Sequence, residues 1–413
     1  MKLLLRTLLV AALVSGPFGL SAQAVRTDIN PAMLYYQAFL SAPQLTEAEM
    51  DYLGTNYWGT QSLPHRYGEL VARYDDEFKL VRQAARSTVP CDWGLDMTTW
   101  PRTLLPHLPR GKAVAVGARS RVVWELAQGK QADARDDLLS TLALARNISH
   151  DGTLIACLVQ IAIESITTWN VAENFGRFTP ETLEQIVAGI DAAPARGTLA
   201  AALTNEVALS HKWIVGTIED LRKTYPGDDA KVMAALRELF KSMRGKSEGE
   251  PDPWDKFIQA AGGSSESILQ MVRDSEPVYG KLLAALAIPL PQFESQEKSL
   301  AAEFENPSNP LLVSFPAILR ARRREARSLV TFAMIRAAVE YKLHGAAALQ
   351  TITDPAGTGP FAFRRFVFNG VDRGFQLTSV LDAGGFNETL VFVETPGPAF
   401  LVGGPHVGQA RGK

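Results

Sequence analysis

Hydrophobic positions recur with the spacing of an α-helix along most of the chain. Two consecutive stretches, ending and beginning around Gly129, place their apolar residues three or four positions apart, which is the spacing of one buried helix face. These positions are Ala115, Ala118, Val122 and Leu126 in the first stretch and Ala134, Leu138, Leu142 and Ala145 in the second. The pattern predicts a helix–Gly–helix hairpin.

Residues typical of helix N-termini predict where further helices of the chain begin. Asn30 before Pro31 predicts a helix cap, and Thr46 followed by Glu49 has the spacing of a capping box. Thr179 before Pro180 predicts another helix start. A longer amphipathic helix is expected from about Tyr67 to Arg86, and a nearly all-apolar, central helix from Thr153 to about Phe175.

The pattern changes after Gly345. Between Phe361 and Val393, apolar residues alternate with polar ones over short stretches separated by turn sequences such as Asn369-Gly370. The fold class is therefore mainly α: a helical-hairpin array of about ten to twelve helices with a small C-terminal antiparallel β unit. The expected division is a signal peptide (1–24), a helical domain (25–345), a β unit packed on the last long helix (346–402) and a disordered tail (403–413).

The N-terminus predicts export. Lys2 and Arg6 precede an apolar run that is too short to span a bilayer, and Ala22-Gln23-Ala24 supplies the small-x-small cleavage pattern. We expect cleavage after Ala24, a periplasmic or secreted mature protein and no membrane span within it. The formal net charge is −2, and loss of Lys2 and Arg6 makes it −4. Nucleic-acid binding is not indicated, because no basic excess is available to neutralise phosphates.

Two cysteines, Cys91 and Cys157, lie in the exported part. Because thiols often oxidise outside the cytosol, we predict a Cys91–Cys157 disulfide, with two buried free thiols as the alternative. The bridge would close a long loop, a constraint that the chain-entropy model values at about 4 kcal/mol. It would fix the proline-rich loop around Trp93 and Trp100 onto the central helix.

Polar residues form one stripe on that central helix, and Gln160 and Glu164 belong to it. If the disulfide holds the loop there, Asp92 and Asp96 would join Glu164 in a carboxylate group beside Trp93 and Trp100. The catalytic candidates are Asp92, Asp96 and Glu164, and the binding candidates are Trp93, Trp100 and Gln160. The alternative is a stripe that faces water or pairs with an arginine of a neighbouring helix.

The C-terminal motifs carry a resemblance. They are Asp354-Pro355-Ala356-Gly357, Phe361-Ala362-Phe363-Arg364 and Gly374-Phe375-Gln376-Leu377-Thr378-Ser379. With the helix–Gly–helix core, which resembles a single tetratricopeptide-type repeat, this ending resembles a group of exported bacterial helical proteins that have no assigned activity. One repeat does not define a solenoid, and the resemblance implies no catalytic residues.

Absent motifs limit the function. The chain has no phosphate-binding glycine loop, no nucleophile elbow, no His-Glu-x-x-His and no Cys-x-x-Cys, and its six histidines are scattered. We therefore expect no metal or cofactor. The sequence favours a non-catalytic protein that binds a protein or a glycan through a surface or groove. The alternative is a glycan-type hydrolase or lyase that uses carboxylates of the Cys91–Trp100 loop and Glu164.

Overall fold

The computed structural model describes residues 26–54, 63–243, 253–303, 309–312, 315–382 and 385–395. The predicted signal peptide and C-terminal tail lie outside these residues. Most of the described chain is helical, and its strands form a single three-stranded antiparallel sheet near the C-terminus. The prediction of a mainly α fold with a small β unit is confirmed.

Fourteen α-helices occur in the described part of the chain, slightly more than expected. They are α2 (Pro31–Ser41), α3 (Glu47–Gly54), α4 (His65–Ala72), α5 (Asp75–Ala85), α6 (His107–Ala127), α7 (Gln131–Ile148), α8 (Leu154–Glu173), α9 (Pro180–Ala192), α10 (Leu199–Thr224), α11 (Asp229–Met243), α12 (Pro253–Ala260), α13 (Ser265–Ala287), α14 (Leu290–Glu303) and α15 (Phe315–His344).

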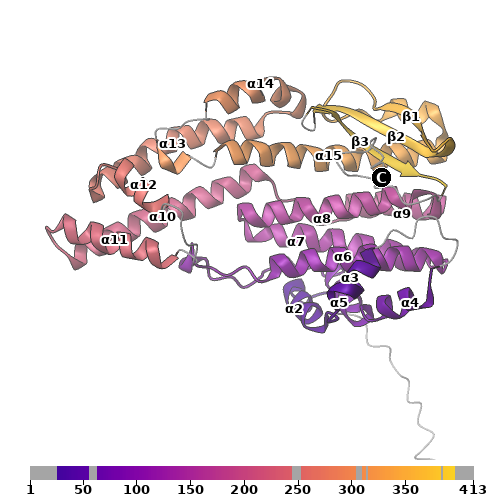
Figure 1. The fold of residues 1–413 in the computed structure, drawn as a ribbon, viewed down its shortest axis with the longest axis horizontal. Coiled ribbons are helices and arrows are strands. Elements are labelled where there is room, and N and C mark those ends of the chain that lie inside the picture. Colours follow the sequence, from indigo (N-terminus) through magenta and orange to yellow (C-terminus); the bar gives the residue numbers. More distant parts are fainter. Residues whose placement is uncertain are drawn as a thin grey trace, which may run out of the picture.

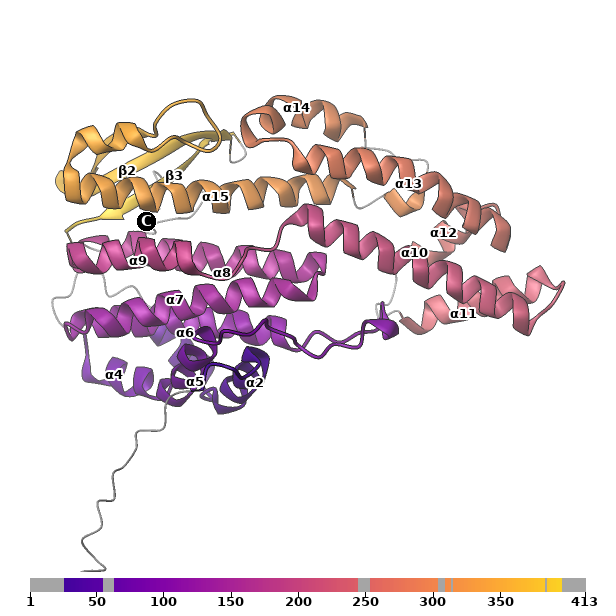
Figure 2. The ribbon, with the colours of Figure 1, turned by 180° about the vertical axis from the view of Figure 1, so that it is seen from behind.

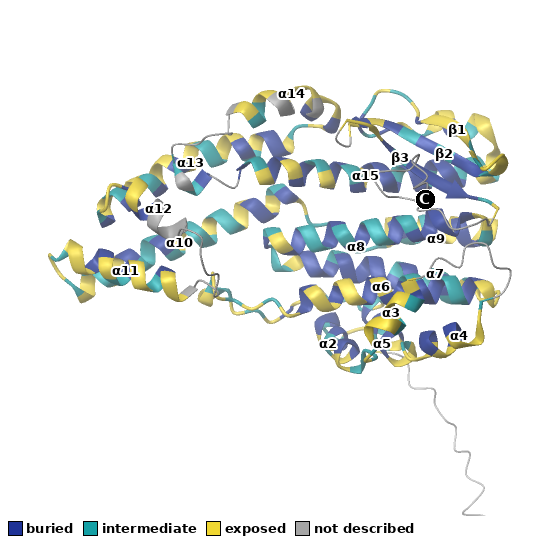
Figure 3. Cartoon of the chain, viewed as in Figure 1, coloured by how far each residue is buried: buried dark blue, intermediate teal, exposed yellow. Residues whose placement is uncertain are grey.

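The helices form a layered body (Figure 1). Helices α6, α7 and α8 run side by side, with α2 to α5 on one side and α15 and the sheet on the other. Buried residues concentrate in these central helices, in α15 and in the last two strands of the sheet (Figure 3). Helix α8 is long and apolar enough to cross a membrane by length and composition, but it packs against α6, α7, α10, α15 and the sheet. We interpret it as the central core helix that its sequence predicts.

A second lobe extends from this body (Figure 2). Helix α10 leaves the body, and its C-terminal half packs with α11, α12 and α13 around a separate hydrophobic cluster that includes Ile218, Phe240 and Ile268. This lobe therefore has a core of its own, while α10 and α13 also contribute to a second cluster that includes Cys157 and Ile161 of α8.

The predicted helix caps explain where several helices begin. The Asn30 side chain accepts a hydrogen bond from the backbone N–H of Ala32, and Thr46 and Glu49 exchange the reciprocal bonds of a capping box. Thr179 caps α9 in the predicted way. Gly129, with a φ of 72°, forms the turn of the α6–α7 hairpin.

One helix prediction is wrong. The segment predicted as a single helix from Tyr67 to Arg86 is divided into α4 and α5 at Arg73 and Tyr74. The break places the acidic residues 75–77 in the first turn of α5, where the helix dipole favours negative charge.

Buried ion pairs join α5, α6 and α7. The Asp137 carboxylate on α7 accepts a hydrogen bond from Nε of Arg82 on α5 (2.5 Å) and another from Nε of Arg121 on α6 (2.7 Å). Glu125 lies within the same cluster, and burial together with the neighbouring Asp137 raises its pKa to about 8.

The sheet consists of β1 (Ala362–Phe368), β2 (Val371–Asp382) and β3 (Asn387–Val393), in that order. Asn369 and Gly370 both have positive φ and form the tight β1–β2 turn that their sequence predicts. Phe375 and Phe392 pack in one hydrophobic cluster with Phe332 and Ile335 of α15. The sheet therefore covers the last long helix, as expected of a unit too small to be stable alone.

Candidate functional site

The loop that carries the predicted tryptophans is part of the core. Trp93 is buried, its Nε1–H donates a hydrogen bond to the carbonyl oxygen of Asn147 (2.8 Å), and its ring stacks on His107. Trp100 packs edge-on against Trp213 of α10 and so connects the loop to the second lobe. Both rings have protein partners, which gives each of them a structural role.

The two aspartates of this loop shape its backbone. The Asp92 carboxylate accepts a hydrogen bond from the N–H of Gly94, and the Asp96 carboxylate accepts one from the N–H of Thr98 (3.0 Å). The bonds from Thr98 lower the pKa of Asp96, which remains ionised at the surface. These are ordinary Asx-type turn contacts.

Glu164 is fully buried and paired. Arg196 holds its carboxylate through bonds from Nε and Nη2 (2.9–3.1 Å), and the Ser328 hydroxyl donates a further bond (2.7 Å). The amide of Gln160, one turn earlier, is bonded to both backbone groups of Gly197. The polar stripe of α8 therefore binds the 196–197 segment and α15, which argues against the proposed carboxylate cleft.

The predicted disulfide is wrong. Cys91 and Cys157 are both free and buried, and they belong to different hydrophobic clusters, the first with α2 and α5 and the second with α10 and α15. Burial raises the pKa of each thiol to about 12. The alternative of two buried free thiols is the one found, and the main support for a loop pinned to α8 is lost.

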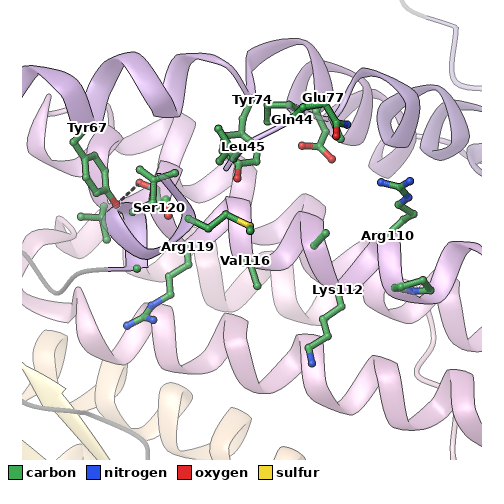
Figure 4. A pocket seen from close by; sticks show the side chains of 18 of the residues that line it. Gln44, Leu45, Tyr67, Tyr74, Glu77, Arg110, Lys112, Val116, Arg119 and Ser120 are labelled. Atoms are coloured by element: carbon green, nitrogen blue, oxygen red, sulfur yellow. Dashed lines mark hydrogen bonds between the residues drawn. The ribbon is translucent and has the colours of Figure 1, made fainter. Parts of the chain in front are cut away.

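A different site lies on the other side of α6. A pocket of about 550 Å³ runs along α6 beneath the α2–α3 connection, with α3, α5 and the end of α8 completing its walls. This volume falls in the range of small-molecule sites, roughly 300 to 1,000 Å³. Its central walls are apolar and include Leu45, Leu53, Val116 and Val123. Figure 4 shows Leu45 and Val116 in the middle of the pocket.

A close approach of α6 to Tyr74 shapes this wall. A Cβ atom at Gly117 would lie 2.7 Å from the Tyr74 ring, so only glycine lets the ring rest against the helix at this point. The phenol group of Tyr74 is partly buried at the pocket, and burial raises its pKa. The aromatic side of the pocket thus depends on a glycine in α6.

One end of the pocket has an unpaired cation. Two of the polar side chains at this end are paired. Arg119 forms a bidentate ion pair with Glu173 (2.9–3.3 Å). Tyr67 donates a hydrogen bond to the carbonyl oxygen of Ser120. Arg177 lines the same end, and no acidic side chain within the described ranges pairs with it. Burial lowers the pKa of its guanidinium, because the charged form loses water. This end therefore attracts an anion.

The other end has an unpaired carboxyl group. Glu77 of α5 is only 2 % exposed, and no described residue forms a hydrogen bond or an ion pair with it. Burial raises its pKa to about 7, against the opposing effect of Arg121 and Arg110. Arg110 and Lys112 stand at this end with exposed side chains, as Figure 4 shows.

The two polar ends are well separated. Arg110 and Ser120 are ten residues apart on α6, which corresponds to about 15 Å along the helix axis. The pocket thus offers an elongated apolar channel with a cation at one end and a buried carboxyl group at the other. In the described part of the chain, no group of three or more His, Cys, Asp or Glu residues could hold a metal ion.

Sequence reasoning missed this pocket, although one signal was present. Glu77 lies three residues after Tyr74 and four before Val81, on the apolar face of its helix. A carboxylate at such a position must be paired, protonated or functional. The remaining lining residues come from segments far apart in the sequence, and only the fold brings them together.

Comparisons with protein-family models, with curated proteins and with solved structures gave no match. The pocket itself is therefore the feature that indicates function.

Proposed function

We propose that this protein is a non-catalytic binding protein whose pocket along α6 takes an elongated amphipathic anion. The ligand class is a small acid, with a carboxylate or another monoanionic group on an apolar chain. The observation that carries the proposal is Arg177: a partly buried guanidinium with no acidic partner among the described residues, at the end of an apolar channel.

Within the described part of the chain, the Arg177 guanidinium lacks an anionic partner, which a ligand can supply. A desolvated arginine without a counter-ion is unfavourable, and an anionic group can supply charge-assisted, two-pronged hydrogen bonds to its guanidinium. The apolar walls contribute through burial of the ligand's hydrocarbon, at roughly 25 cal/mol per Å². A neutral glycan would satisfy neither feature, so the pocket favours an amphipathic acid over a sugar.

Calorimetric titration with sodium dodecanoate, below its micelle concentration, tests this proposal. Dodecanol and dodecyltrimethylammonium serve as ligands with the same chain and different head groups. We expect dodecanoate to bind best and Arg177→Gln to weaken it by roughly tenfold or more, as expected for a hydrogen bond to a charged group. Dodecanol binding should change little in this variant.

Two further variants separate the pocket from general effects. Val116→Trp, which places a large ring on the apolar wall, should weaken all three ligands. Arg324→Gln, which removes an exposed charge on α15 that does not line the pocket, should leave them unchanged. Equal affinity of wild type and Arg177→Gln for dodecanoate, or no binding to the wild type, would contradict the proposal.

Export is part of the same proposal, as is membership of the group of exported helical proteins that the C-terminal motifs resemble. The free thiols are compatible with an oxidising compartment, because burial keeps both sulfhydryl groups protonated and separate. The test is N-terminal sequencing of the protein recovered outside the cytoplasm. A mature chain that begins at Val25 is expected, and a retained Met1 would refute export with cleavage.

A further inference from the structure

The unpaired carboxyl group of Glu77 gives more information about the ligand. A buried polar group without a hydrogen-bond partner is costly, and a bound ligand is one way to supply that partner. Glu77 lines the pocket and is 2 % exposed, and no described residue forms a hydrogen bond or an ion pair with its carboxyl group. It stands at the end opposite Arg119 and Tyr67 (Figure 4).

We infer that the ligand is an apolar acid with a second polar group, a hydroxyl or an amide, at the end of its chain opposite the anion, and that this group bonds to Glu77. The inference rests on the proposed function and specifies its ligand class. A ligand of this kind has polar atoms at both ends and hydrocarbon between them, in the same order as the pocket.

The surroundings of Glu77 select the kind of polar group. A second carboxylate would be repelled by ionised Glu77 inside an apolar channel. An ammonium group would attract Glu77, but Arg110 and Lys112 stand at the same end and oppose a further cation. A hydroxyl group donates to an ionised carboxylate and accepts from a protonated carboxyl group. It therefore suits this end in either protonation state.

The experiment compares three acids of equal chain length: dodecanoate, ω-hydroxydodecanoate and dodecanedioate. Their affinities are measured by calorimetry at pH 8 on wild type, Glu77→Met, Glu77→Gln and the control Asp76→Asn, which changes an exposed residue of the same helix. The wild type and the control should bind ω-hydroxydodecanoate roughly tenfold more tightly than dodecanoate, the size of one good buried hydrogen bond. Dodecanedioate should bind most weakly.

The variants should change this order in different ways. Glu77→Met removes the partner of the hydroxyl group, so the preference for ω-hydroxydodecanoate should disappear or reverse while dodecanoate still binds. Glu77→Gln keeps a hydrogen-bonding group without charge, so the hydroxyl preference should remain and dodecanedioate should gain affinity. Retained dodecanoate binding shows that each variant is folded.

Two outcomes overturn the inference in distinguishable ways. If the wild type binds dodecanoate and the ratio of the hydroxy acid to dodecanoate is the same in wild type and Glu77→Met, this inference is wrong and the proposed function stands. If the wild type binds none of the three acids, both fail.

Discussion

Replacement of Glu77 by glutamine should remove a pH-dependent loss of stability. The Glu77 carboxyl group is 2 % exposed, and burial raises its pKa from 4.5 to about 7. The charged groups that act on it are Arg110 and Arg121, which favour the ionised form without fully offsetting its desolvation, and it in turn raises the pKa of Tyr74. The folded protein therefore holds this proton more tightly than the unfolded chain does.

The direction of the effect follows from linkage. Below pH 4.5 the group is protonated in both states, and its ionisation costs nothing. Between pH 4.5 and about 7 the unfolded chain releases the proton while the folded protein retains it, so stability falls as the pH rises. Above about pH 7 the full cost remains, about 3 kcal/mol at 1.36 kcal/mol for each pH unit between the two pKa values.

Urea denaturation followed by tryptophan fluorescence from pH 4 to 9 measures this cost. The free energy of unfolding of Glu77→Gln should equal that of the wild type near pH 4 and exceed it by about 3 kcal/mol at pH 8. Glu125, whose pKa is also raised, contributes the same pH dependence to the free energy of unfolding of both proteins. Its contribution therefore cancels when the two free energies are subtracted. Asp76→Asn serves as the control. Parallel profiles for wild type and Glu77→Gln would show that ionisation of Glu77 does not destabilise the folded protein.

Three further predictions concern the rest of the fold. Arg196→Met should lower the free energy of unfolding by about 3 to 5 kcal/mol, because Glu164 would keep a buried charge without its main partner. A loss below about 1 kcal/mol, measured by denaturant titration, would show that Arg196 is not the main partner of Glu164. Thiol titration without reductant should find two reactive thiols in denaturant and neither in the native protein, and a bridged pair would give none in both conditions. Truncation after Gly345 should expose the α15 face around Phe332 and Ile335 and so lower the solubility and the melting temperature. An equally soluble and heat-stable fragment would show that the helical domain does not depend on the β unit.

Local signals in the sequence predicted most of the fold. Helix caps such as Asn30 and Thr179 act within one turn, and the Asn369-Gly370 turn is specified by two residues with positive φ. The break at Tyr74 was missed because the apolar spacing continues across it. Asp75, the first residue of α5 after the break, pairs with Arg121 of α6, and this contact joins distant parts of the chain.

The interpretation of the α8 stripe and of the cysteine pair depended on distant contacts in the same way. The polar stripe on α8 was consistent with a cleft or with a buried network. Glu164 of this stripe is bonded to Arg196 and Ser328, which are remote from α8 in the sequence. Cys91 and Cys157 were paired because no other cysteine is present, yet each fills its own hydrophobic cluster. The pocket could not be predicted because its walls come from α3, α5, α6 and the end of α8, which only the tertiary structure assembles.

A crystal structure of the protein grown with dodecanoate would show directly whether the pocket along α6 binds an amphipathic acid through Arg177. We expect electron density for the ligand along α6, with its carboxylate within hydrogen-bond distance of the Arg177 guanidinium and its chain between Leu45 and Val116. Dodecanoate bound elsewhere on the protein, or bound in the pocket with its carboxylate directed away from Arg177, would contradict this expectation.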